Sequence, residues 1–81
     1  MRSLREIAEE IERDCSGKQW YVYAEAYVTP MKSLESLSDT YGADSAESIV
    51  LYALSNLTYW RGDTARRIKA ELNSMLKGVK V

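Results

Sequence analysis

The residues that carry out most protein chemistry are scarce in this sequence. It contains no histidine, which excludes histidine general bases, histidine-assisted nucleophiles and the commonest metal ligand. Its single cysteine, Cys15, can form neither an intramolecular disulfide nor a zinc site alone. Neither of the common glycine-rich phosphate-binding motifs is present. We therefore expect a protein that is not an enzyme and that has no metal site and no cofactor.

Acidic residues are frequent near the N-terminus, but their spacing places them on the solvated side of a helix. Ser3 and Glu6 have the S-x-x-E spacing of a capping box, which predicts a helix over residues 3–15. Its apolar stripe comprises Leu4, Ile7, Ala8, Ile11 and Cys15. Because Cys15 closes this stripe, we expect a small buried hydrophobic residue rather than a nucleophile.

Apolar spacing elsewhere predicts further helices. The most apolar stretch, residues 45–60, has Ala46, Ile49, Val50, Ala53, Leu57 and Trp60 at steps of three and four. Leu51, Tyr52 and Leu54 extend its apolar surface to the other side, which is typical of a helix with several neighbours. We predict an all-α fold, a small bundle of four to five short helices near 3–15, 19–28, 30–37, 45–59 and 64–77, within a single domain spanning 1–81.

Residues 19–29 fit two types of secondary structure. Period two places alternate residues on one face and predicts a strand, whereas period 3.6 predicts a helix equally well. We favour the helix, because the chain contains no second convincing strand to pair with it. The alternative is an α+β fold in which 19–29 is a strand paired in a dimer. Pro30, with Thr29 as its N-cap, is expected to open the next helix at 30–37.

One short segment resembles a known attachment site. Gly42-Ala43-Asp44-Ser45, opening a helix that continues with ESIVLYAL after Ala46, resembles the phosphopantetheine attachment segment of acyl and peptidyl carrier proteins, over residues 42–54. The resemblance implies a four-helix domain with Ser45 as the modified serine. Asp-Ser before a helix is also ordinary N-cap chemistry, so a capping role for Ser45 stays open beside carrier function.

Charge is unevenly distributed along the chain, although the net charge is only −1. Residues 1–60 contain five basic and ten acidic side chains, whereas residues 61–81 contain six basic and two acidic ones. Arg66, Lys69 and Lys77 lie on one side of the predicted last helix, so nucleic-acid binding by this helix is an alternative function. The charge polarity also suits an acidic protein partner or a second copy of the chain.

The aromatic residues favour a protein partner. All eight are Tyr or Trp, which are enriched where two proteins meet. The expected function is a small interaction module, a regulator, adaptor or inhibitor of a larger protein machine of the kind that phages and other mobile elements also encode. We expect a homodimer as one form of this contact. The predicted partner-binding residues are Tyr21, Tyr23, Tyr27, Trp60, Arg66, Arg67, Lys69 and Lys77.

Two patterns in the sequence bear on where the protein is located in the cell. Residues 1–10 lack the apolar centre of a signal peptide, and no apolar run reaches the roughly 18–20 residues of a membrane span. We expect a cytoplasmic protein without a membrane partner.

Overall fold

The computed structural model describes residues 2–79, and this range is mostly helical, as the apolar spacing predicts. The elements are α1 (Leu4–Cys15), α2 (Tyr21–Met31), β1 (Thr40–Tyr41), β2 (Asp44–Ser45), α3 (Ala46–Ser55) and α4 (Asp63–Val79). The two short strands pair antiparallel and form a small sheet that the sequence analysis does not predict. None of the helices in the described range combines the length and apolar character needed to cross a membrane.

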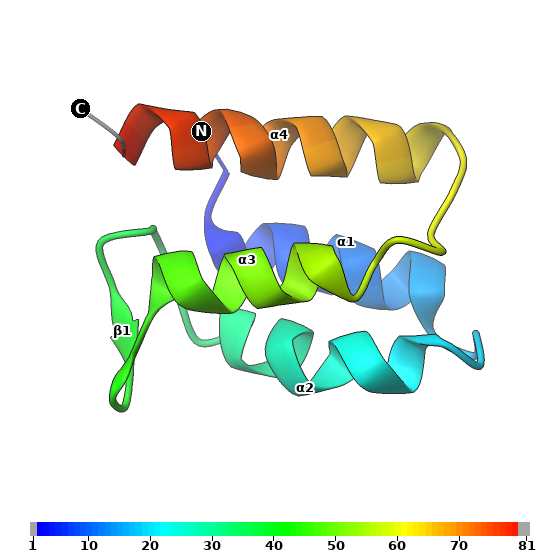
Figure 1. Ribbon diagram of the computed structural model, residues 1–81, viewed down its shortest axis with the longest axis horizontal. Coiled ribbons are helices and arrows are strands. Elements are labelled where there is room, and N and C mark those ends of the chain that lie inside the picture. The colour runs from blue at the N-terminus through cyan, green and yellow to red at the C-terminus, as the bar shows by residue number, and fades with distance from the viewer. Residues whose placement is uncertain (1, 80–81) are drawn as a thin grey trace.

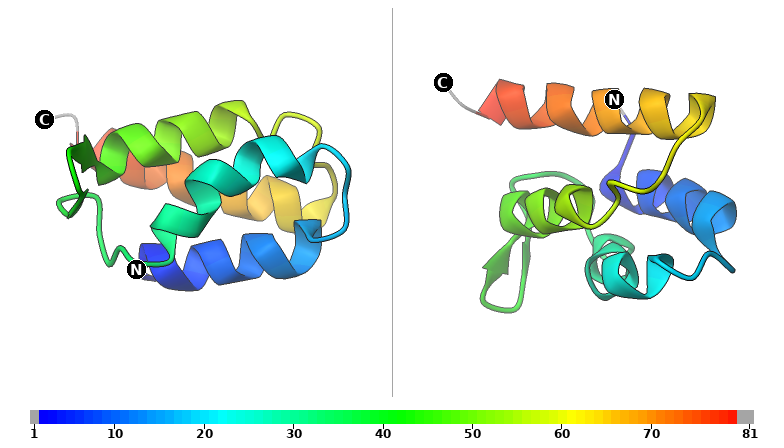
Figure 2. Two further views of the ribbon diagram at one scale, coloured as in Figure 1. Left: turned by 90° about the horizontal axis from the view of Figure 1, so that it is seen from below. Right: turned by 45° about the vertical axis from the view of Figure 1, so that its right-hand side comes forward.

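The helices surround one core. α2 and α4 lie on opposite sides of α1 and α3, which both contact each of them (Figures 1 and 2). Every helix contributes buried side chains, among them Ile7, Ile11, Val28, Val50, Ile68 and Leu72. The hairpin projects from the end of the molecule at which α3 begins (Figure 1). The core thus holds α2 and α3 side by side, with their remaining sides free to form a surface.

The capping box at the start of α1 is confirmed. Ser3 Oγ accepts a hydrogen bond from Glu6 N at 3.2 Å, and Glu6 Oε1 accepts one from Ser3 N at 3.0 Å. The bond from the Ser3 backbone stabilises the carboxylate and lowers the pKa of Glu6. The next two amides, of Leu4 and Arg5, donate to carbonyls of the loop that follows α2. The first turn of α1 is therefore anchored to a distant segment.

The segment that fits two periods, residues 19–29, is helical rather than extended, but the break predicted at Pro30 is wrong. α2 continues through Pro30 to Met31, because the fixed φ of proline is compatible with a helix and Val28 and Met31 keep the last turn in the core. Consequently no helix forms over 30–37. Successive turns follow instead, and they bury Leu34 and direct its carbonyl to the amide of Arg5 at 2.9 Å.

The helix predicted over 45–59 ends earlier, at Ser55. Asn56 is the C-cap of this helix, where its Nδ2 and its backbone N–H both donate to the carbonyl of Tyr52, at 2.9 and 3.2 Å. Leu57 and Trp60 are buried, as expected, but from the turns that follow the helix. Before α3, Gly42 has a φ of +62° in a two-residue hairpin loop, a conformation that glycine adopts readily.

The core assignment predicts the effects of a matched pair of substitutions. Leu72→Ala removes a fully buried side chain and should lower the free energy of unfolding by about 2–5 kcal/mol. Leu51→Ala makes the same change on the exposed side of α3 and should cost less than about 1 kcal/mol. Urea unfolding followed by circular dichroism measures both. Equal losses for the two variants would contradict the assignment.

Candidate functional site

α2 and α3 differ from the other two helices in how few charges they carry. Glu25 is the only charged residue of α2, and Glu47 is the only one of α3. By contrast, α1 contains seven charged residues and α4 contains six. Helices of a small domain normally present charges on the side that faces solvent. The outer sides of α2 and α3 instead present tyrosine and aliphatic side chains.

We call the exposed and half-buried aromatic side chains on this surface the aromatic face. It consists of Trp20, Tyr23, Tyr27, Tyr41, Tyr52 and Tyr59, from α2, α3, the hairpin and the turns that flank the helices. Tyr23 and Tyr59 are 70% and 71% exposed, and Tyr52 is 57% exposed. Exposure of several large aromatic side chains on adjacent elements is characteristic of a binding surface.

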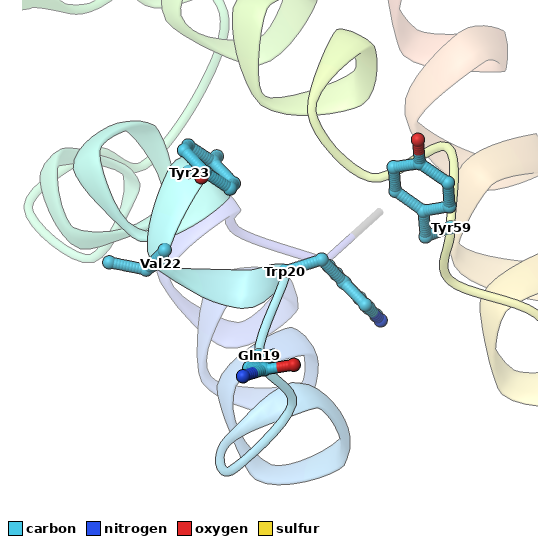
Figure 3. Close-up of a pocket in the computed structure, with 5 residues that line it drawn as sticks. All are labelled: Gln19, Trp20, Val22, Tyr23 and Tyr59. Carbon is cyan, nitrogen blue, oxygen red and sulfur yellow. The ribbon is translucent and has the colours of Figure 1, made fainter.

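One end of the aromatic face contains an open cavity of about 550 Å³. Tyr23 at the start of α2 and Tyr59 from the turns after α3 lie on either side of Trp20, while Gln19 and Val22 complete the lining (Figure 3). None of these five residues is charged. Such a concave, neutral and aromatic surface suits an apolar or aromatic side chain of a partner.

The other end contains a second cavity, of about 560 Å³, where α2, α3 and the hairpin meet. Tyr27 of α2 stacks on Tyr52 of α3, with ring centroids 5.4 Å apart and an angle of 28° between the rings. Tyr41 and Asp44 of the hairpin line the same cavity. This end therefore combines aromatic rings with a carboxylate.

Of the predicted partner-binding aromatic residues, Tyr23 and Tyr27 lie on the aromatic face, but Tyr21 and Trp60 lie in the core. Tyr21 is only 5% exposed, and burial raises the pKa of its hydroxyl to about 12. Trp60 is 3% exposed, and its Nε1 donates to Asp14 Oδ2 at 2.6 Å. In this conformation both side chains are almost entirely covered by the rest of the protein.

The predicted basic residues all lie on α4, and several of them bind groups of the protein itself. Arg67 pairs with Glu10 of α1, and Lys69 Nζ donates to the carbonyl of Trp60 at 2.8 Å. Arg66 pairs with Asp63 at 3.4 Å, although both side chains are highly exposed. Lys77 is exposed near the end of α4. The structure thus does not place these residues on α2 or α3 beside the tyrosines.

A network of charges joins α1 to α4. Arg2 donates to Glu71 at 2.6 Å and to Glu10 at 2.7 Å, and Arg67 also donates to Glu10. The hydrogen bonds from Arg2 and then Arg67 lower the pKa of Glu10, and those from Glu71 and then Glu10 raise the pKa of Arg2. These ion pairs connect the first helix to the last, so the side chains that form them have a structural role.

Ser45 and Cys15, the two other residues considered for chemistry, each have a structural role. Ser45 is the N-cap of α3, where its Oγ accepts from Ser48 N at 3.1 Å and donates to Ser48 Oγ at 3.0 Å. Cys15 is fully buried, and desolvation raises the pKa of its thiol to about 12, which disfavours the reactive thiolate. Within residues 2–79, no three Cys, Asp or Glu side chains gather to hold a metal ion.

Five members of this site are absent from the predicted partner-binding set: Trp20, Tyr41, Asp44, Tyr52 and Tyr59. The apolar residues on both sides of the segment 45–60 predicted a helix with several neighbours, but the structure leaves Leu51 and Tyr52 48% and 57% exposed. This surplus of apolar surface is the signal that could have pointed to Tyr52. Tyr41 and Asp44 are brought together only by the hairpin, whose strands are two residues long and leave little pattern in the sequence. In comparisons with protein-family models, curated proteins and solved structures, nothing matches the chain.

The surroundings of Tyr21 predict the effect of removing its hydroxyl. This oxygen is buried and has no hydrogen-bond partner among the described residues, so Tyr21→Phe removes an unsatisfied polar group. We expect thermal or urea unfolding to show unchanged stability or a gain of up to about 1 kcal/mol. Tyr23→Phe on the exposed face is the matched control and should change stability by less than about 0.5 kcal/mol. A marked loss in Tyr21→Phe alone would show that the hydroxyl is bonded in solution.

Proposed function

We propose that this protein is a small non-enzymatic interaction module that binds a partner protein through its aromatic face. The observation that carries the proposal is the exposure of uncharged aromatic and aliphatic side chains along α2 and α3, helices with one charged residue each. Leaving such side chains in water is unfavourable, and a partner that covers them gains their burial.

The chemistry of the aromatic face supports a protein as the ligand. Tyr and Trp provide a large contact area at a low cost in side-chain entropy, and their polar ends tolerate both water and a partner. They are therefore enriched at the centres of protein interfaces. The two cavities would receive side chains of the partner, one at each end of the face.

The proposal that the protein is not an enzyme is supported by its residues. The sequence contains no histidine, and its only thiol is buried with a raised pKa. The cavities of the aromatic face are lined mainly by tyrosine and aliphatic side chains, which suit contact rather than acid–base chemistry.

The cellular role that fits such a module is that of a cytoplasmic regulator, adaptor or inhibitor of a larger protein machine. We further propose that the four helices act as one compact bundle that presents this face as a unit. A second copy of the chain is the alternative occupant, and it would produce a homodimer in which the two aromatic faces pack together.

Affinity capture from an extract of the source cells tests the proposal. The wild-type protein should retain one stoichiometric partner, and Tyr23→Ser/Tyr52→Ser should reduce the retained amount at least about tenfold, because interface tyrosines are often worth more than 1.4 kcal/mol. Circular dichroism checks that the variant is folded. Light scattering on the same samples measures self-association.

Arg66→Ala/Lys77→Ala is the matched control, since it removes two exposed side chains from α4 and leaves the aromatic face intact. It should retain the partner. Loss of the partner in this variant, with retention in the tyrosine variant, would overturn the proposal and identify the basic side of α4 as the binding surface.

A further inference from the structure

The cavity beside the hairpin has a chemical composition that the rest of the aromatic face lacks. Three tyrosines, Tyr27, Tyr41 and Tyr52, line it together with the carboxylate of Asp44. Rings of aromatic side chains beside a carboxylate are the arrangement that binds organic cations, because the faces of the rings carry partial negative charge.

The fold brings these groups together. Tyr41 and Asp44 are directly opposite each other in the hairpin register, so their side chains lie on the same side of the small sheet. Tyr52 stacks on Tyr27 but remains 57% exposed, so the stack occupies only one side of its ring. The three tyrosines therefore come from α2, α3 and the hairpin, and they converge on one volume.

Among residues 2–79, no basic side chain balances the charge of this cavity. Asp44 is the only charged residue of the lining, and its carboxylate forms no ion pair and no hydrogen bond with the other described residues. An incoming cation would therefore meet an unpaired carboxylate and no competing positive side chain in the lining.

We propose that this cavity binds an arginine side chain of the partner protein, with its guanidinium stacked on Tyr52 or Tyr41 and hydrogen-bonded to Asp44. The inference rests on the proposed interaction function and specifies the chemistry that the partner presents. Arginine fits better than lysine, because its planar guanidinium stacks on aromatic rings and can donate two parallel hydrogen bonds to one carboxylate. Arginine is also a frequent central residue of protein interfaces.

The cavity at the other end of the face provides an internal comparison. It contains Trp20, Tyr23 and Tyr59 but no charged residue. A cation bound in that cavity would contact the aromatic rings but would have no carboxylate to pair with. The guanidinium should therefore bind in the cavity beside the hairpin, and this preference should depend on the carboxylate of Asp44.

Titration of the ¹⁵N-labelled protein with N-acetyl-arginine amide, followed by NMR, tests the proposal. We expect saturable shifts at the amides of residues 27, 41, 44 and 52. N-acetyl-citrulline amide, which is similar in shape but uncharged, should give no saturable shifts. Blocked lysine should bind at least about threefold more weakly. Asp44→Asn and Tyr52→Leu should each weaken arginine binding about fivefold or more.

Tyr23→Leu is the matched control, because it removes a tyrosine of α2 that lines the other cavity. It should leave arginine binding unchanged. The proposal is overturned if arginine gives no saturable shifts, if citrulline or lysine binds equally well, or if Asp44→Asn has no effect in a folded protein. If arginine fails while Tyr23→Ser/Tyr52→Ser still abolishes partner capture, the interaction function stands and only the arginine assignment fails.

Discussion

The four helices share a single core, and this core buries only one side of each helix. α1 and α4 are adapted to this constraint, because each has an apolar stripe and a charged outer side. α2 and α3 are not, since they present aromatic and aliphatic residues on the side that the core does not reach. Tyr21 and Tyr23 illustrate the difference, as the first lies in the core and the second lies in solvent. The surplus apolar surface of α2 and α3 forms the aromatic face.

The distribution of charge reinforces this division. Arg67 of α4 pairs with Glu10 of α1, and Arg2, just before α1, pairs both with Glu10 and with Glu71 of α4. Lys69 binds the carbonyl of Trp60 and supports the turn before α4. The charge polarity of the chain therefore stabilises contact between its first and last helices. The outer side of α2 and α3 carries few charges, and among the described residues the carboxylate of Asp44 at one end of it has no ion-pair partner.

Local signals in the sequence predicted much of the fold. The capping box at Ser3 and the stripe of α1 were correct, because both depend on neighbours within one or two helical turns. The failures lay at Pro30, where packing outweighed the local signal for a break, and at Asn56, which caps the helix before the apolar spacing ends. Contacts such as Arg2 with Glu71 leave no local pattern, because the residues lie far apart in the chain. Tyr23 belongs to a tyrosine-rich segment that is visible in the sequence, whereas the cavity at the hairpin depends on contacts between distant segments.

The central claim is that the aromatic face is exposed in the free protein and covered in the cell. Nitration of tyrosines by tetranitromethane, mapped by mass spectrometry, measures both states in one experiment. In the purified protein, Tyr23, Tyr52 and Tyr59 should react readily, while Tyr21 should be protected by the core. In native extract, Tyr23 and Tyr52 should become protected. Unchanged reaction of these two tyrosines in extract, or reaction of Tyr21 as fast as Tyr23, would contradict the account.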